Sequence, residues 1–371
     1  MKIAICCNHS MPHCGGSEYI IQQIAESMQK DYNHNVVIFS KSILKSIIYN
    51  DIKIIPCFND NVFLSQISNF DHILIYSDYF CYWPLILKNR EKISAKISIA
   101  LVGMNRMLSG GNSDKNCFDL FIKKYKQFNV ITHSDNYLDY KKCREYKIPV
   151  NVIHNFVNLE KFKKEIDFRK KYKIDTQYIV LCVSNFFYGK GQENLVKILN
   201  ILSETRDDFT VVFISNKVNF RPSKILSLEC KKQLNRSSFK YKFLENIPRK
   251  DVISSFFDSD VFAFPSQKEV SPIVILESMA AELPWVSFPV GNTTQLKGGI
   301  ISEIRGIDEK NNLICDSSNF KYFANCVGKI LDDKEIEKKL KKEGKEQIEK
   351  EYNYKKIMEN YNQIFIEQSY C

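Results

Sequence analysis

The sequence alternates short apolar, β-branched runs with amphipathic helical patterns, and this alternation restarts half-way along the chain. In the first half, strands are predicted at 2–7, 35–40, 72–76, 96–102 and 129–133, with a helix at 17–29. Near-continuous apolar strands separated by helices are typical of a parallel sheet that helices cover on both faces. The first half therefore predicts one doubly wound α/β domain.

The second half repeats the pattern with its own strands and helices. Strands are predicted at 178–184, 209–215, 240–247, 260–265 and 285–290, and helices at 192–202 and 272–283. A chain of 371 residues is too long for one ordinary core. We therefore expect two Rossmann-like domains facing across a cleft, with ligands bound outside the carboxyl ends of the strands. The charged tail from 334 to 368 has a helical pattern suited to the outside of both domains.

Composition excludes several classes of protein. The chain is 44% hydrophobic and 26% charged, as globular proteins are, and no apolar run reaches the roughly 18–20 residues of a membrane helix. The apolar stretch at 2–7 is too short for the core of a signal peptide. Twelve dispersed cysteines form no Cys-x-x-Cys pair, and six histidines complete no zinc spacing. We expect reduced thiols, a cytoplasmic protein and no metal site.

Positive charge is concentrated in one stretch of a chain whose net charge is +10. Between Phe121 and Lys173, fourteen Lys and Arg face six acids. Such a stretch is either a solvated face or a contact for nucleic acid, anionic lipid or a phosphorylated acceptor. Nucleic acid is disfavoured because no aromatics interleave the cations in a recognisable module. A peripheral contact with the anionic inner face of a membrane remains open.

Two of the predicted strand-to-helix loops have the composition of a phosphate site. Gly15 and Gly16, in HCGGSE after the first strand, let a ligand approach backbone N–H groups at a helix start. Lys190 and Gly191, in SNFFYGKGQENL, place an ammonium beside another helix start. Ordinary turn chemistry explains either loop equally well, and the P-loop pattern is not met.

The third loop, EVSPIVILE at 269–277, brackets an apolar helix start with two carboxylates. Ser271 is predicted as the N-cap and the following proline as the first helical residue, which leaves the N–H groups of Ile273 and Val274 without helical partners. Glu269 lies in the loop and Glu277 on the helix, among apolar residues. A buried, unpaired acceptor costs roughly 1–3 kcal/mol, so Glu277 needs donors, which a sugar and a ribose could supply.

These segments together resemble a known family. E-x7-E stands within a longer run: PS, E-x-x-P, LESMAAELP and VGN. VIHNFVNLEKF (152–162), FLENIPRKDVISSFFDSDVFAFPS and the ending EYNYKKIMENYNQIF flank it in the same order. From Cys14 to about Glu367 the chain is similar to the retaining glycosyltransferases of family 4, which have the GT-B fold.

The resemblance implies a domain layout and a donor site. It implies an acceptor-binding domain at 1–165, a nucleotide-sugar-binding domain at 166–352 and a C-terminal helix, 353–371, that crosses back to the first domain. The implied donor-binding residues are Gly15, Gly16, Asn185, Lys190, Ile247, Glu269, Ser271, Ile273, Val274 and Glu277. Glu269 and Lys190 are the implied catalytic pair.

Each implied role has a chemical reason. Glu277 would bind the ribose, Glu269 the hydroxyls of the transferred sugar, and the backbone at Ile247 the nucleobase. Lys190, the N–H groups of Ile273 and Val274, and Gly16 from the other domain would hold the diphosphate. Charge develops on that diphosphate as it leaves, and cations and N–H donors stabilise it without a metal. The implied reaction moves a hexose-type sugar from a nucleotide-diphosphate sugar to a glycan or lipid-linked glycan.

The sequence departs from the family pattern at two positions. Asn185 stands where the family commonly has arginine, and Gly103 stands nearest the usual sugar-binding histidine, with Asn105 or Arg106 as substitutes. The glycine-rich segment 109–112 is either an acceptor loop or a plain surface loop. A non-catalytic GT-B partner subunit, a nucleotide-sugar epimerase and a phosphorylase therefore stay open as alternatives. The base, sugar, acceptor, linkage and oligomeric state are not specified by the sequence.

Overall fold

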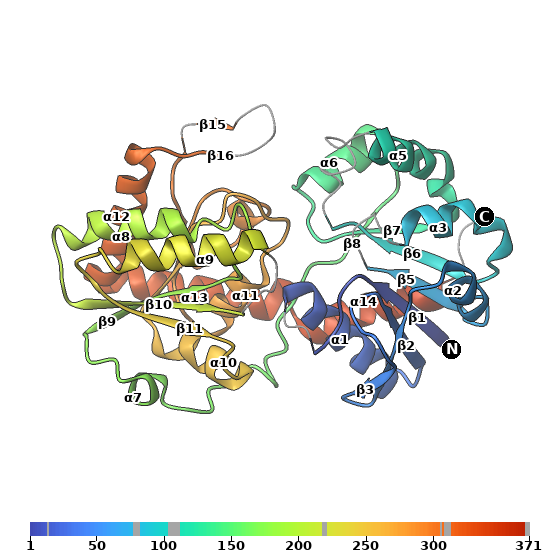
Figure 1. The fold of residues 1–371 in the computed structure, drawn as a ribbon, viewed down its shortest axis with the longest axis horizontal. Helices are drawn as coiled ribbons and strands as arrows, with labels where there is room; N and C mark the ends of the chain where they lie inside the picture. The colour runs from blue at the N-terminus through green and yellow to red at the C-terminus, as the bar shows by residue number, and fades with distance from the viewer. Residues whose placement is uncertain are drawn as a thin grey trace. The chain divides into compact units, whose positions relative to one another are not determined.

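The computed structural model describes residues 1–12, 15–76, 82–102, 112–216, 221–304, 306–307 and 313–367, and it divides into two compact units (Figure 1). The first unit contains Met1–Asn155 together with the chain from Lys355 onward, and the second contains Phe156–Tyr354. We describe each unit by itself. Gly103, Asn105, Arg106 and the predicted acceptor loop up to residue 111 lie outside the described residues.

The first unit is built on an eight-stranded sheet of order β3-β4-β2-β1-β5-β6-β7-β8. The strands are β1 (Lys2–Cys7), β2 (Asn35–Ser40), β3 (Ile47–Tyr49), β4 (Ile52–Pro56), β5 (His72–Ile75), β6 (Lys96–Ala100), β7 (Asn129–Thr132) and β8 (Asn151–Val152). Neighbouring strands pair in parallel, except that β3 pairs antiparallel with β4 at the edge. Strand order reverses between β1 and β5, so the loops that follow these two strands flank the switch point of this sheet.

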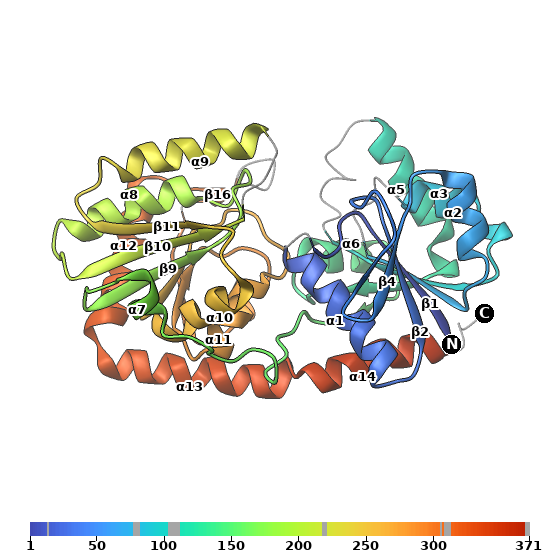
Figure 2. The same ribbon diagram turned by 60° about the horizontal axis from the view of Figure 1, so that its bottom comes forward.

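Helices cover both faces of the first sheet, as Figure 2 shows. They are α1 (Gly16–Lys30), α2 (Asp60–Ile67), α3 (Trp83–Lys88), α5 (Asn112–Lys124), α6 (Leu138–Glu145) and α14 (Tyr354–Ile366). On one face α14 packs the ring of Phe365 against His72 of β5, at 4.8 Å between centroids. On the other face α3 and α5 meet through Trp83 and Phe121, at 5.1 Å.

The second unit has a six-stranded, all-parallel sheet of order β11-β10-β9-β12-β13-β14. The strands are β9 (Tyr178–Val183), β10 (Phe209–Ser215), β11 (Lys240–Glu245), β12 (Val261–Phe264), β13 (Trp285–Ser287) and β14 (Gly299–Ile301). A short antiparallel pair, β15 (Gly306–Ile307) and β16 (Leu313–Ile314), is separate from it. The order reverses between β9 and β12, which makes the loops after these two strands the expected ligand site.

Two layers of helices enclose this second sheet in both views (Figures 1 and 2). One layer contains α8 (Gln192–Ser203), α9 (Arg221–Leu234) and α12 (Ser317–Asp332). The other contains α10 (Arg249–Asp258), α11 (Ile273–Ala280) and α13 (Lys334–Glu351), and α7 (Phe168–Tyr172) precedes β9. The core between the layers is rich in aromatic residues, with Phe209, Phe213, Phe256 and Trp285 almost completely buried.

The predicted α/β class with two Rossmann-like parallel sheets is confirmed, and three strands match to the residue: β1, β2 and β10. The helix in the E-x7-E segment begins one residue later than predicted. Pro272, with φ −72° and ψ 112°, is extended and serves as the N-cap, whereas Ser271 lies outside the helix. The predicted helical tail is two helices, α13 and α14, because the chain leaves the helical conformation around Tyr352.

The division between the units falls after Asn155, earlier than the boundary predicted at 165/166. The reason lies in the segment 156–165, whose apolar side chains pack into the second core. Val157 is 1% exposed and Phe162 is 3% exposed there, and the ring of Phe162 lies 5.7 Å from that of Phe257. The buried side chains of Val157 and Phe162 therefore attach this segment to the second unit.

Within the part of the chain that the structure describes, no helix combines the length and apolar character needed to cross a membrane. The same residues contain no cluster of three or more His, Cys, Asp or Glu arranged to hold a metal ion. The cysteines described as free include Cys6, Cys7 and Cys143, all buried, and burial raises the pKa of the Cys143 thiol to about 12.

Candidate donor site

The loops after β9 and β12 meet at the switch point of the second sheet, and they bring Lys190 and Glu269 together. The Lys190 Nζ donates to Glu269 Oε1 at 2.6 Å. The Ser266 hydroxyl donates to the same oxygen at 2.7 Å. Glu269 retains 11% of its side-chain exposure and Lys190 retains 28%, so the pair is accessible from one side.

The backbone of the Lys190 loop is fixed against the Glu269 loop. Gly189 accepts hydrogen bonds from the Gln267 N–H at 2.7 Å and from the Ser266 hydroxyl at 3.2 Å. Gly191, the N-cap of α8, has φ +71°, and a Cβ built there would lie 2.2 Å from the Pro265 carbonyl oxygen. Only glycine fits such a close approach in the left-handed region. The two loops therefore hold the ammonium and the carboxylate as one unit.

The second carboxylate of the motif meets a different cation. Glu277 on α11 is 4% exposed, and its Oε1 accepts a hydrogen bond from the guanidinium of Arg249, the first residue of α10. Arg249 keeps 40% of its side-chain exposure and lies over the ring of Phe162, 5.9 Å from its centroid. Pairing with a cation makes the burial of this charge tolerable.

The start of α11 supplies N–H groups between the two carboxylates. Ile273 and Val274 occupy its first two positions, where N–H groups have no partner one turn back in the helix. The loop that precedes α11 is also held by the loop after β13, because the Asn292 N–H donates to the Val270 carbonyl at 3.0 Å. Both partial positive charge and free donors thus face the end of the sheet where Lys190 lies.

Asn185 has a structural role in this loop. Its Oδ1 accepts the Asn216 N–H at 2.9 Å, and its carbonyl accepts from Gln192 Nε2 at 3.1 Å. Asn185, which was predicted to bind the phosphate, therefore connects the end of β9 to the loop after β10 by a hydrogen bond. Ile247 lies in the loop after β11, two residues before Arg249, and is partly buried.

The remaining predicted donor residues lie in the first unit. Gly15 is the N-cap of α1 in extended conformation, with φ −140° and ψ 170°, and Gly16 is the first helical residue. They follow β1, at the switch point of the first sheet. Their helix start has an acidic residue, Glu18, in its first turn.

Two site residues were missed by the analysis of the sequence. Arg249 and Ser266 each bond one carboxylate of the motif. Both residues lie in segments that carry the family resemblance. The sequence analysis, however, assigned the hydrogen-bond donors of the two glutamates to the bound sugar and ribose. A glutamate predicted to be buried on a helix needs a cation nearby, and Arg249 at the start of the preceding helix is a candidate. This pattern would have identified Arg249.

Residues 163–347 match the family model of the glycosyl transferases group 1. The second unit belongs to this family. The predicted resemblance is confirmed at this level, and the match contains every predicted donor residue of the second unit, from Asn185 to Glu277.

Curated relatives are distant and longer than the matched region. The chain is 25% identical over 226 residues to the capsular polysaccharide biosynthesis glycosyltransferase CapM of Staphylococcus aureus. The aligned region covers 57% of this chain and 52% of CapM. An uncharacterized glycosyltransferase of Haemophilus influenzae is 22% identical over 188 residues, which is 48% of that protein. The chain thus spans about half the length of the curated relatives it matches.

Solved structures establish the fold over nearly the whole chain. Sucrose-phosphate synthase from Thermosynechococcus elongatus is similar with a TM-score of 0.78 at 16% identity, covering 98% of both chains. Anabaena HepE in complex with UDP has a TM-score of 0.76 at 14% identity and covers 98% of this chain and 99% of its own. At such identities the likeness shows the GT-B fold and no more.

Proposed function

We propose that the protein is a glycosyltransferase that moves a hexose-type sugar from a nucleotide-diphosphate sugar to a glycan or lipid-linked glycan, with retention at the anomeric carbon. The observation that carries the proposal is two ion pairs, Lys190–Glu269 and Arg249–Glu277, whose glutamates have seven residues between them and lie on either side of the α11 N-terminus. CapM is named for capsular polysaccharide biosynthesis, which supports a surface glycan as the product class.

The donor is assigned by the chemistry of the ion pairs. A diphosphate needs cations and N–H donors, which Lys190 and the start of α11 offer. Hydroxyl groups of a sugar and a ribose need acceptors, which the carboxylate oxygens of Glu269 and Glu277 offer. HepE has been solved with UDP and with UDP-glucose, and this supports a nucleotide-sugar donor.

Bond breaking would place negative charge on the leaving diphosphate. Lys190 would stabilise that charge directly, and Glu269 would orient Lys190 while it holds the sugar hydroxyls. The leaving phosphate would take the proton of the acceptor, which attacks on the same face. No cofactor or divalent metal is part of this proposal, so chelation of metals should leave the rate unchanged.

A thermal-shift panel of UDP, GDP, ADP and CMP with wild type and Glu277→Ala tests the proposal. One nucleoside diphosphate should stabilise the wild type, and the variant should bind it about a hundredfold more weakly, because its ribose loses charge-assisted acceptors. Glu346→Ala, on the exposed surface of α13, is the matched control and should bind like wild type. Equal binding by Glu277→Ala and wild type would contradict the ribose role.

A non-catalytic GT-B partner subunit is the second candidate, and Asn185 favours it. The side chain at this position bonds the backbone of Asn216, so it adds no cation to the phosphate site. Such a subunit should give no shift with any of the four nucleotides, and no turnover when it is mixed with donor sugars and acceptor glycans.

A further inference from the structure

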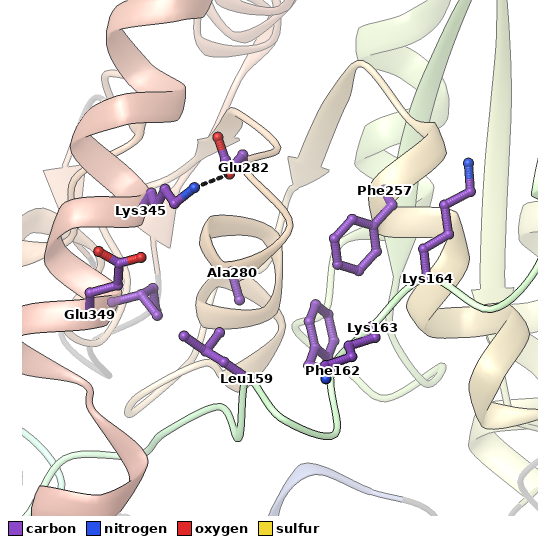
Figure 3. Close-up of a pocket in the computed structure, with 10 residues that line it drawn as sticks. Leu159, Phe162, Lys163, Lys164, Phe257, Ala280, Glu282, Lys345 and Glu349 are labelled. Atoms are coloured by element: carbon purple, nitrogen blue, oxygen red, sulfur yellow. Dashed lines mark hydrogen bonds and ion pairs between the residues drawn. The ribbon is translucent and has the colours of Figure 1, made fainter.

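A half-open cavity of about 320 Å³ lies in the second unit, away from the donor site (Figure 3). Ala280, the last residue of α11, forms part of its wall, about 10 Å along the helix from Ile273 at the donor end. Its other walls come from the connecting segment 156–165, from α10 and from α13. Its volume is at the lower limit of ligand pockets, which have about 300–1,000 Å³.

The interior of this cavity is apolar and partly aromatic. Phe162 and Phe257 present their rings side by side, with centroids 5.7 Å apart, and Figure 3 shows Ala280 and Leu159 across from them. Ile348 of α13, 1% exposed, completes the floor, whereas Leu159 stands 39% exposed at the mouth. Because Phe162 and Ile348 are almost completely buried, an apolar body in the cavity would chiefly contact the partly exposed Phe257 and Ala280 and the exposed Leu159.

The rim of the cavity has one lysine that forms no ion pair with an acid. Lys345 donates to Glu282 at 2.6 Å, and Figure 3 shows Glu349, the other acid of the lining, on α13 beside Lys345. Lys164 is bonded to Asp258. Lys163 is exposed and, among the residues that the structure describes, forms no ion pair. An ammonium beside an apolar wall favours a ligand that is anionic at one end and apolar at the other.

The cavity is linked to the donor site by two short routes. Phe162 of the cavity floor lies under the Arg249 guanidinium, which bonds Glu277. Ala280 of the wall follows Glu277 by three residues on the same helix. A ligand that immobilises Phe162 would therefore also restrict Arg249 and, through it, the carboxylate assigned to the ribose.

We propose that this cavity is a regulatory site for a small amphipathic anion, an aromatic or alicyclic body with one carboxylate, sulfonate or phosphate group. The anion would contact Lys163, its apolar body would cover Leu159 and Phe257, whose ring contacts Phe162, and its binding would tighten nucleotide binding at Glu277. The binding of the anion is independent of the proposed transferase function, whereas its effect on the nucleotide rests on that function.

Calorimetry with naphthalene-2-sulfonate tests the site, with methanesulfonate as the anionic group alone and 2-naphthol as the neutral body. The wild type should bind the sulfonate at least tenfold more tightly than either fragment, and Lys163→Glu and Leu159→Ser should each lose about tenfold in affinity. Lys170→Glu, an exposed lysine on α7 outside the cavity, should bind like wild type. Full affinity in both cavity variants, or no binding by the wild type, would overturn the site.

The regulatory part is tested by titrating the preferred nucleoside diphosphate with and without saturating naphthalene-2-sulfonate. The probe should tighten nucleotide binding by about fivefold in the wild type and have no such effect in Arg249→Met. Probe binding that leaves nucleotide affinity unchanged in the wild type would overturn the regulation. If no nucleotide binds with or without the probe, the transferase proposal fails, and the cavity is still decided by the first titration.

Discussion

Buried ionisable groups are treated differently in the two units. In the second unit, the buried carboxylates of Asp251 and Glu277 are paired with cations, Asp251 with Lys171 at 2.5 Å and Glu277 with Arg249. In the first unit, the two buried histidines are held neutral. Burial lowers the pKa of His72 to about 3 and that of His133 to about 4.

The contrast is between ion-paired carboxylates and neutral imidazoles, and the first unit also buries the carboxylate of Asp139, which is 2% exposed. Burial alone would raise the pKa of Asp251, but hydrogen bonds from Lys171 and Tyr172 lower it, so the carboxylate stays ionised. A paired carboxylate can exchange part of its bonding for a ligand hydroxyl, whereas a buried neutral imidazole contributes packing and one hydrogen bond.

The largest expected effect comes from removing the ammonium of the donor site. Lys190→Ala removes the cation that we propose stabilises the leaving diphosphate, and Glu269 then keeps its hydrogen bond from the Ser266 hydroxyl. We expect kcat/KM for sugar transfer to fall by about 10²–10³, which corresponds to roughly 3–4 kcal/mol of transition-state stabilisation. Lys268→Ala, an exposed lysine in the neighbouring loop, should retain wild-type kinetics. Equal kinetics for both variants would show that Lys190 does not act on the phosphate.

The next effect tests the neutral histidine of the first unit. His133 bonds the Ile153 carbonyl at 2.9 Å through Nδ1, and its pKa of about 4 lies below the ordinary value of about 6.5. The folded state therefore binds fewer protons than the unfolded state between these pH values. Stability from this group is complete above about pH 6.5 and is lost as the pH falls toward 4, by roughly 3 kcal/mol.

Urea unfolding at pH 7 and pH 5 measures this loss. The transition that involves the first unit should weaken at pH 5 in the wild type and change less in His133→Gln, whose amide can still donate to Ile153 but does not titrate. A histidine NMR titration should show His133 unprotonated at pH 5.5. Protonation of this ring near pH 6.5 in the folded protein would contradict the assignment.

A third effect tests how closely the two loops of the donor site must approach. Gly191→Ala puts a Cβ 2.2 Å from the Pro265 carbonyl at a positive φ, so the loop must shift and should lose about 2 kcal/mol of stability. Nucleotide affinity should fall as well, since Lys190 precedes this residue. Gly328→Ala, within α12 and with 3.6 Å to its nearest neighbour, should instead gain up to about 1 kcal/mol. Differential scanning calorimetry of the two variants checks both signs.

The sequence predicts the long elements with a strong hydrophobic pattern. It does not predict short strands or helix ends that depend on tertiary contacts. Strands such as β10 are buried along their whole length, so their apolar runs are unambiguous. β3 and β14 have three residues each, too few for a periodicity, and they form only because a neighbour pairs with them. Pro272 illustrates the limit at helix ends, since its ψ of 112° depends on the loop before it.

The ion pairs of the candidate donor site were not predicted from the sequence. The carboxylates 269 and 277 are spaced by local sequence, which the E-x7-E pattern reports directly. Their cations lie 79 and 28 residues away in the chain and meet them only through the order of the strands. Spacing cannot give such distant partners, although the cost of a buried charge requires that some partner exist.

The smallest expected effect concerns the basic stretch between Phe121 and Lys173. The structure divides this stretch between the two units, so the two parts can be compared. Lys123 and Lys126 lie exposed on the first unit, whereas Lys163 and Lys170 lie on the second. Lys124, which the sequence would group with the first pair, is instead bonded to Glu91 at 2.8 Å. If an anionic membrane is a partner, we propose that it contacts the first unit, where each exposed lysine would contribute about 1 kcal/mol.

Sedimentation with vesicles that contain phosphatidylserine, an anionic lipid of the cytoplasmic leaflet, measures this contribution. Lys123→Glu with Lys126→Glu should weaken vesicle binding by at least tenfold at low salt, and the loss should shrink as salt is added. The matched pair Lys163→Glu with Lys170→Glu changes the net charge equally and should weaken binding much less. Equal losses would show that binding follows net charge alone, and the first unit would then have no special role at a membrane.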